Sequence, residues 1–567
     1  GKSTAKSHLL SDQYFCPIGD NDRLSFGNPG DRLVASFPKT RENGDLNLLS
    51  SLSNNTIYRL GTGILWFLVI LGLPITSFPF LAELTGAIVA PFSAIPLALL
   101  ILIWLIPFLF ERGKFPIEIL PFLYFIIVAL IISALAFFLD GHYARGRDFF
   151  GQSLRAFITV IIGLSFYLVF SAFPQNENRL RQTLVFISIM GALLIPWTLF
   201  EVMLLRKYSL VQGFPVWVNK IRSFLAVQSP NIMFTNRVTG FAYEPSWFVR
   251  IFNLVLFPIW LSAIFHRKSV FRFRLWIFQI EDLLMVLGLI VFGFTSPRIG
   301  LIAFLASVAM LGLLLLHKLN QKFTAWYLSK MKHPPKHIFW VNALFVLVIF
   351  VILFGLSAGA LTAYISAASS WDNRFQMFRD MTNIDDLELL PLRELKILYL
   401  ARDLAFFERV VFWISGWEIF NDYPFGVGLG NAGFYFNERM PGAGLESFEV
   451  RNFIYRAGYL GNTKNMYTRL LAETGFIGLT LFLAWLYLLW RSAALTRKSD
   501  SPILRIVGLA GQLFLLAYLF ESLSMDSFAM PYQWVMTGLI SAAGLAARRE
   551  LRLKDKEPAS VLDPLKT

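Results

Sequence analysis

The segment FWVNALFVLVIFVILFGLSAGALTAYI, residues Phe339–Ile365, gives the clearest indication of the fold class, because it contains no charged side chain. A helix of about 20 mostly apolar residues is long enough to cross the hydrocarbon core of a bilayer. Working outward from this stretch, the sequence predicts twelve such spans. They are Leu60–Ala82, Ala87–Phe110, Ile117–Leu139, Leu154–Phe173, Leu184–Leu205, Trp247–Phe265, Leu275–Phe294, Ile299–Leu316, Phe339–Ile365, Tyr467–Leu489, Ile503–Phe520 and Phe528–Ala547. Glu281 and Asp282 interrupt the seventh span, which leaves its start open.

The composition indicates the same class. Of the 567 residues, 56% are hydrophobic and 16% are charged, against about 25% charged in soluble domains. The net charge of +14 comes largely from Lys and Arg that flank the apolar runs, with no basic helix or aromatic-interleaved basic strand, so we expect no nucleic-acid partner. The single cysteine, Cys16, excludes a disulfide within the chain and a cysteine-based metal site. We therefore predict an all-α, polytopic bundle of membrane helices.

Lys and Arg in the short loops predict the orientation. With the N-terminus inside, the short inside loops hold 16 of them and the short outside loops three, Arg145, Arg147 and Arg298. Both termini are then cytoplasmic. The predicted organisation is a disordered cytoplasmic tail (1–56), spans 1–9 with a basic outer loop at 206–246 (57–365), an extracytoplasmic cap loop (366–466), spans 10–12 (467–547) and a basic cytoplasmic tail (548–567).

The first long outer loop is strongly basic. It holds Arg206, Lys207, Lys220, Arg222 and Arg237 against one acid, Glu244. The forked N–H donors of an arginine guanidinium match phosphate oxygens, so this loop would attract a phosphorylated ligand. A solvated loop with scattered charges is the alternative explanation of the same pattern. Glu244 precedes Pro245 and Ser246, which suit a helix start. It is either a cap carboxylate or a general base at the membrane surface.

The second long outer loop combines an aromatic helix pattern with a glycine-rich turn. Trp413, Trp417 and Phe420 recur at helical spacing, which suggests a helix that lies on the membrane or covers a cavity. A small packed cap without chemistry is the alternative. Residues 428–433 fit GxGxxG, but a dinucleotide site needs a preceding buried strand and a βαβ unit, and neither is predicted. We interpret the glycines as a turn that brings the backbone close to the bilayer surface or to a sugar.

Two motifs in and after this loop resemble a known family. Arg409 and Trp413 precede Pro424-x-Gly426-x-Gly428-x-Gly430, and Asn465-x-Tyr467 precedes Leu471-x-Glu473-x-Gly475-x-x-Gly478-Leu479. Together they resemble the signature of the O-antigen ligase and O-antigen polymerase superfamily of integral-membrane (GT-C type) glycosyltransferases. The segment from Arg237 to Ser246 and the twelve-span layout are similar as well.

The resemblance implies an enzyme of the bacterial inner membrane that needs neither metal nor cofactor. Such enzymes transfer a glycan from undecaprenyl diphosphate to an acceptor glycan on the periplasmic face, in polysaccharide and lipopolysaccharide biosynthesis. The expected partners are the lipid-linked oligosaccharide, the acceptor glycan, membrane lipid and a chain-length regulator. In the ligase branch a histidine precedes Asn-x-Tyr, and this chain has Lys464 there. His142 is the one histidine that our topology places outside. Lys464 in place of this histidine favours a polymerase over a ligase.

We expect arginines to hold the leaving diphosphate and a carboxylate to activate the acceptor. The predicted catalytic residues are Glu244, Arg237, Arg298 and Arg409, and the predicted substrate-binding residues are Arg147, Arg155, Arg222, Lys464, Asn465 and Tyr467. Arg298 stands at the mouth of the eighth span, where snorkelling to the interface is the alternative. The favoured function is an inverting polymerase that extends a lipid-linked glycan. The alternatives are a ligase that transfers the finished glycan to a lipid or protein, and a transporter or flippase of lipid-linked saccharides.

Overall fold

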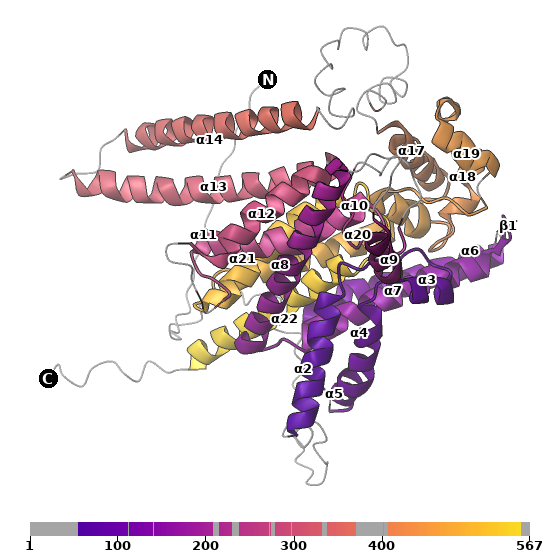
Figure 1. The fold of residues 1–567 in the computed structure, drawn as a ribbon, viewed down its shortest axis with the longest axis horizontal. Helices are drawn as coiled ribbons and strands as arrows, with labels where there is room; N and C mark the ends of the chain where they lie inside the picture. The colour runs from indigo at the N-terminus through magenta and orange to yellow at the C-terminus, as the bar shows by residue number, and fades with distance from the viewer. Residues whose placement is uncertain are drawn as a thin grey trace, which may run out of the picture. The chain divides into compact units, whose positions relative to one another are not determined.

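A computed structural model gives the fold. It describes residues 55–111, 113–139, 141–207, 215–228, 237–271, 273, 278–295, 298–331, 337–369, 401, 406–456 and 458–556. The predicted tail at 1–56 falls almost wholly outside these residues, as do parts of both long outer loops. Most of the described chain is helical (Figure 1). The two strands among these residues, β1 (Tyr143–Ala144) and β2 (Arg147–Asp148), form one short antiparallel hairpin. The predicted all-α class is confirmed.

Within the described part of the chain, eight helical segments are long and apolar enough to cross a membrane. They are η2–α6 (Ile117–Ile119 and Leu120–Leu139), α7 (Phe149–Ala172), α8 (Glu177–Lys207), α10–η4–α11 (Pro245–Ile251, Phe252–Leu256 and Phe257–His266), α13 (Arg298–Ser329), α14 (Ile338–Ala368), α20 (Met466–Thr496) and α21 (Pro502–Glu521). Shorter apolar segments are α2 (Thr56–Leu71) and α4–η1–α5 (Ala94–Leu100, Ile101–Leu105 and Ile106–Phe110). In addition, α12 (Ile280–Thr295) and α22 (Pro531–Lys556) occupy the seventh and twelfth predicted spans. The chain is a multi-pass membrane protein, and twelve spans remain a prediction.

The first predicted span, Leu60–Ala82, is wrong in its second half. Helix α2 ends at Leu71, where the N–H of Gly72 donates to the carbonyl of Leu68 at 2.9 Å. Pro74 follows shortly, and the residue before a proline is biased away from helical conformation. A separate short helix, α3 (Pro79–Thr85), contains only the end of the apolar run.

The seventh predicted span begins with its two acidic residues. Helix α12 starts at Ile280, so Glu281 and Asp282 lie in its first turn, where the helix dipole favours negative charge. The Glu281 carboxylate is buried and accepts from the N–H of Val270 at 2.7 Å. The carboxylate of Asp282 accepts from the N–H of Gln279 at 2.8 Å. These residues therefore belong to the first turn of the helix and do not interrupt it.

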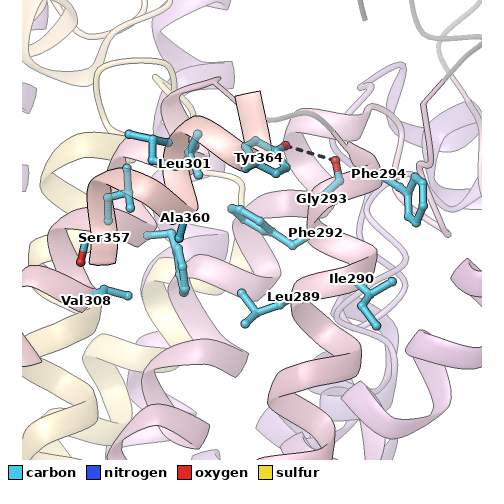
Figure 2. Close-up of a pocket in the computed structure, with 13 residues that line it drawn as sticks. Leu289, Ile290, Phe292, Gly293, Phe294, Leu301, Val308, Ser357, Ala360 and Tyr364 are labelled. Carbon is cyan, nitrogen blue, oxygen red and sulfur yellow. Dashed lines mark hydrogen bonds between the residues drawn. The ribbon is translucent and has the colours of Figure 1, made fainter. Parts of the chain in front are cut away.

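Helix α14 is fixed to its neighbours mainly near its ends. At one end the rings of Phe345 and Phe323 stack with centroids 4.1 Å apart, and Thr324 donates to Asn342 at 3.0 Å. Near the other end the hydroxyl of Tyr364 donates to the carbonyl of Gly293 on α12 at 3.2 Å (Figure 2). Beside this second contact, α12, α13 and α14 line an apolar pocket that is partly open.

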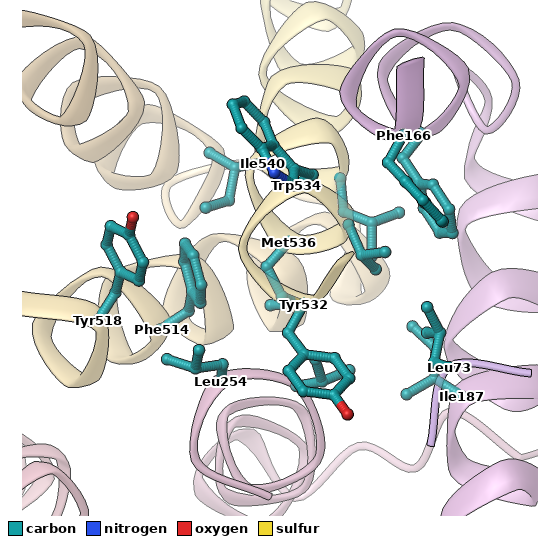
Figure 3. Close-up of a cluster of buried hydrophobic side chains, with 14 of the residues drawn as sticks. Leu73, Phe166, Ile187, Leu254, Phe514, Tyr518, Tyr532, Trp534, Met536 and Ile540 are labelled. Carbon is teal, nitrogen blue, oxygen red and sulfur yellow. The ribbon is translucent and has the colours of Figure 1, made fainter. Parts of the chain in front are cut away.

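Tightly packed aromatic side chains hold α22 against α7, α20 and α21. Figure 3 shows Trp534, Tyr532 and Tyr518 within this core, and all three are almost fully buried. Gly163 on α7 permits the contact, because a Cβ there would lie 2.2 Å from the Trp534 ring. Small residues bring membrane helices close enough to pack, since lipid provides no hydrophobic driving force between them.

The described parts of the two long outer loops form short helices. They are α9 (Val216–Leu225), α17 (Phe407–Asp422), η6 (Ala432–Phe434), α18 (Phe436–Arg439), η7 (Gly442–Glu446) and α19 (Phe448–Arg456). The helix predicted from the aromatic spacing is confirmed as α17. Its buried face holds Val411, Phe412 and Ile419, whereas Trp417 is 48% exposed. Trp417 therefore points outward, whereas Trp413 is half-buried.

Candidate functional site

The glycine-rich turn at Pro424–Gly430 packs against helix α20. Gly426, Gly428 and Gly430 have φ angles of 93°, 91° and 87°, a left-handed conformation that favours glycine. The N–H groups of Val427 and Gly428 donate to the carbonyls of Ala472 and Glu473, both at 2.9 Å. The close approach predicted for this turn is therefore made to a helix, where we had expected the bilayer surface or a sugar.

Helix α20 is kinked at Gly475 to receive this turn. Gly475 has φ 62° and ψ −167°, and a Cβ there would lie 2.3 Å from the Pro424 carbonyl oxygen. Next to the kink, the buried Glu473 carboxylate pairs with Arg469 at 3.0 Å. The two sequence motifs thus form one structural unit, and Glu473 serves to build it.

Three of the predicted substrate-binding residues lie at the start of α20. The Asn465 side chain caps the helix by accepting from the N–H of Tyr467 at 2.8 Å, and the Tyr467 hydroxyl donates to the carbonyl of Leu519 at 2.8 Å. Lys464 has a left-handed φ of 53°, and its N–H donates to the Asp526 carboxylate at 3.0 Å. Its ammonium pairs with Glu449 and lies 4.4 Å from the centre of the Phe412 ring. Lys464 is therefore held in place by partners from three segments.

Arg409 on α17 is the centre of a cluster of charged groups. Its guanidinium donates to the carbonyl of Ser524, in the loop between α21 and α22, at 3.3 Å. Burial lowers the pKa of Arg409, the charge of Arg250 lowers it further, and the carboxylates of Glu244, Glu449 and Asp526 raise it. We call Arg409, Arg250, Glu244, Glu449, Asp526 and Ser524 the Arg409 cluster. The cluster joins the first outer loop, the cap loop and the α21–α22 loop.

A buried ion pair supports the cluster from the bundle side. Arg250 on α10 lies 3.5 Å from the Glu521 carboxylate on α21, and both side chains are almost fully buried. The guanidinium of Arg250 also donates to the carbonyl of Ser524 at 2.7 Å. Asn253 donates to Glu521 at 2.7 Å and to the carbonyl of Gly300 at 2.8 Å. The network links α10, α13 and α21 on the bundle side of Arg409.

Glu244 occupies the residue position that precedes α10 but does not cap it through its carboxylate. Pro245 is the first helical residue, as predicted, and the Glu244 backbone carbonyl accepts from Trp247 and Phe248 at 3.1 Å. The carboxylate accepts from the hydroxyl of Ser246 at 3.0 Å. It is half-buried, and its charge acts on Arg409. The carboxylate thus faces the cluster.

Arg298 stands at the first residue of α13 and lies close to α17. Its guanidinium lies 4.6 Å from the centre of the Phe406 ring. Phe406 is the residue immediately before α17, which carries Arg409. The structure therefore brings Arg298 to the same side of the bundle as the Arg409 cluster.

One basic residue of the first outer loop, Arg222, pairs with a buried acid. Arg222 on α9 forms an ion pair with Glu201 on α8 at 3.2 Å and donates to Thr239 at 3.0 Å. Burial lowers the pKa of Arg222, and the charge of Glu201 raises it. Arg237 is half-buried two residues before Thr239. Glu201 thus anchors the start of the segment that ends at Glu244.

Arg147 and Arg155 lie on a separate part of the molecule, the β1–β2 hairpin and the start of α7. Arg147 donates to Gln152 at 3.0 Å, and burial lowers its pKa with a smaller contribution from the Arg155 charge. The neighbouring Arg145 donates to the carbonyl of Tyr459 at 2.7 Å, which fixes the hairpin to the cap loop. His142 lies beside Tyr435, with ring centroids 5.0 Å apart.

Sequence reasoning missed five members of this arrangement: Arg250, Glu449, Glu521, Ser524 and Asp526. Two of them carried a usable signal. Arg250 falls inside the predicted sixth span and Glu521 lies one residue after the predicted eleventh span, and ionisable groups at membrane depth are paired or functional. Ser524 and Asp526 stand in a short loop whose position depends on tertiary contacts.

The comparison with protein families gives one match, which includes the cap loop. Residues 283–483 match the family model described as O-antigen ligase. This range covers α12 to the first half of α20, including Arg298, Arg409, Lys464 and both sequence motifs. No curated protein matches the chain.

Proposed function

We propose that this chain is a polysaccharide polymerase of the O-antigen ligase and O-antigen polymerase superfamily, which the family match over residues 283–483 supports. It would transfer a glycan from undecaprenyl diphosphate to the acceptor sugar of another lipid-linked unit. The site would lie on the periplasmic face of the inner membrane, with both termini in the cytoplasm. The observation that carries the proposal is the Arg409 cluster, where three polar segments meet at one end of the bundle.

The chemistry would begin at the anomeric carbon of the donor sugar. The acceptor hydroxyl forms a new C–O bond to this carbon while the bond to the diphosphate breaks, and the diphosphate leaves with the electron pair. Attack from the opposite side inverts the configuration. Negative charge builds on the leaving diphosphate, and the guanidinium groups of Arg298 and Arg409 would stabilise it, with Arg237 as a further candidate. Loss of one such donor costs about 3–4 kcal/mol of transition-state stabilisation.

The acceptor hydroxyl must lose its proton as it attacks. Glu244 is our candidate for the general base, because its half-buried carboxylate faces Arg409 and makes no capping bond to α10. Lys464 would orient the acceptor or the diphosphate, since Glu449 and Phe412 hold its ammonium in place. Arg147, Arg155 and Arg222 would bind more distant parts of the glycans. The reaction as proposed requires no metal or cofactor.

A ligase is the second candidate, because the matching family model carries that description. Lys464 in place of the ligase histidine is the feature that favours the polymerase. The two differ in their acceptor, so one assay separates them. Purified full-length protein is incubated with the lipid-linked repeat unit alone. A ladder of longer lipid-linked chains supports the polymerase, and a product that forms only after a second acceptor is added supports the ligase.

A further inference from the structure

A second group of basic side chains lies away from the Arg409 cluster, at the opposite ends of four helical segments. His266 is the last residue of α11, Lys318 lies on α13, Arg497 directly follows α20, and Arg505 lies in the first turn of α21. We call these four residues the His266 cluster. At their other ends the same segments carry or adjoin residues of the candidate site, namely Arg250, Arg298, Asn465 and Glu521. Our predicted topology places the His266 cluster on the cytoplasmic side.

Backbone contacts between the helices bring these residues together. The hydroxyl of Ser262 on α11 donates to the carbonyl of Ile506 on α21 at 2.8 Å. Gly508 on α21 permits a close approach to the end of α20, because a Cβ there would lie 2.3 Å from the backbone nitrogen of Arg497. The guanidinium of Arg497 donates to the side chain of Gln512 on α21 at 2.8 Å. Helix α21 therefore holds the ends of α11 and α20 in one place.

The charges of the His266 cluster are close enough to act on one another. The ammonium of Lys318 lies 3.9 Å from the centre of the ring of Phe265, which directly precedes His266. The positive charges of the three other members act on the His266 ring. The charges of Arg497 and Arg505 also act on Lys318. Like charges this close repel, so a carboxylate or a bound anion must compensate them.

Within the residues that the structure describes, no carboxylate forms an ion pair with the His266 cluster. The carboxylate of Asp500 pairs with Lys554, and Arg505 donates to the backbone carbonyl of Asp500 at 3.4 Å. Nε of Arg505 and Nε2 of His266 are buried and have no hydrogen-bond partner in that part of the chain. The positive-inside pattern explains why basic residues lie at this end of the bundle, but not why four segments bring them together.

We propose that the His266 cluster binds a phosphate group. Guanidinium and ammonium groups bind phosphate oxygens through charge-assisted hydrogen bonds. Lys318 is exposed, and Arg497 and Arg505 are half-buried, so the cluster is accessible from the side of Lys318. This proposal does not depend on the transfer reaction, because the cluster lies at the other end of the bundle.

The position of the cluster favours the headgroup of an anionic phospholipid as the source of the phosphate. Leu315 precedes Lys318 by about one turn of α13 and is 40% exposed, on a helix that is long and apolar enough to cross a membrane. Acyl chains would lie along this helix while the headgroup meets the basic side chains. Basic pockets between membrane helices on the cytoplasmic side bind anionic headgroups in this way. A free phosphate ion offers the same group without the chains.

The test measures the unfolding temperature of the purified full-length protein in detergent, because a ligand that binds only the folded state raises it. Phosphatidylglycerol, zwitterionic phosphatidylcholine and inorganic phosphate are titrated separately. We expect a saturable rise with phosphatidylglycerol that phosphatidylcholine does not produce. A rise with phosphatidylglycerol alone identifies a lipid headgroup, and a rise with inorganic phosphate identifies a free phosphate. Equal rises with the two lipids, or no rise with any of the three, would overturn the proposal.

Three variants locate the binding. Lys318→Gln removes an exposed charge from the cluster, and Lys330→Gln removes an exposed charge directly after α13 as the matched control. One basic residue beside an anionic headgroup contributes about five-fold to affinity, so Lys318→Gln should raise the apparent Kd for phosphatidylglycerol, or for phosphate if that is the ligand, by about five-fold. Lys330→Gln and the charge-conserving Lys318→Arg should bind like the unchanged protein. Equal Kd values in Lys318→Gln and Lys330→Gln would contradict the assignment to this cluster.

Discussion

Arg250 and Arg409 both donate to the carbonyl oxygen of Ser524, at 2.7 and 3.3 Å. The two guanidinium groups come from different segments, α10 and α17, and converge on the loop between α21 and α22. Like charges this close repel, so a carboxylate or a bound anion must compensate them. Glu521 compensates Arg250 within the bundle. Arg409 lies nearer the outer loops and is the group that we assign to the diphosphate.

The Arg250–Glu521 pair gives a stability prediction. Glu521→Gln leaves a buried guanidinium without its counter-charge, and removal of one partner of a buried pair costs about 3–5 kcal/mol. We expect a clear fall in the unfolding temperature of the purified protein in detergent. The double variant Arg250→Met with Glu521→Leu replaces the pair by apolar side chains and should recover most of that loss. If the single and double variants unfold at the same temperature, the pair does not have this role.

Glu244→Gln tests the proposed base. The amide keeps the size of the side chain but cannot take a proton, and loss of a general base lowers rates by about 10²–10⁴-fold. Chain elongation from the lipid-linked repeat unit, measured as the rate of ladder growth, should fall by that amount. Glu438→Gln on α18 removes an exposed carboxylate and is the control. Equal rates in the two variants would exclude Glu244 as the base.

Gly475→Ala tests the structural unit that the two sequence motifs build. A residue with φ 62° and ψ −167° is in a region that only glycine occupies readily, at a cost of about 1–3 kcal/mol for other residues. The added Cβ would also collide with the Pro424 carbonyl. We expect a lower yield of folded protein and a lower unfolding temperature. Gly442→Ala, where a Cβ meets no atom within 4 Å, should leave both unchanged; an equal loss there would mean that Gly475 has no special role.

Apolar runs predict much of this fold, because lipid accepts only helices that satisfy their own backbone. The same reasoning fails where local backbone chemistry interrupts a run, as at Gly72 and Pro74. It identified Glu244, Arg298, Arg409 and Lys464 from their position beside spans or motifs. It could not predict the hydrogen bond between Lys464 and Asp526, because this contact depends on how distant loops pack.

Two features of the site are only partly visible in the sequence. Arg250 stands in an apolar span, where the cost of a charge implies a partner, and Glu521 supplies that partner 271 positions later. The periodicity of an apolar run gives no information about which of the other helices provides the counter-charge. The packing of the Pro424–Gly430 turn on the kink at Gly475 is likewise a tertiary event, although both halves were visible as glycine patterns.

The binding of undecaprenyl diphosphate to the Arg409→Ala protein tests whether Arg409 holds the diphosphate, because binding separates this contact from catalysis. Arg439→Ala is the matched control, since Arg439 lies on the same cap loop in an exposed ion pair with Asp422, and such pairs contribute about 0–1 kcal/mol. We predict that Arg409→Ala raises the Kd at least ten-fold and that Arg439→Ala leaves it unchanged. An unchanged Kd in the correctly folded Arg409→Ala protein would contradict the account.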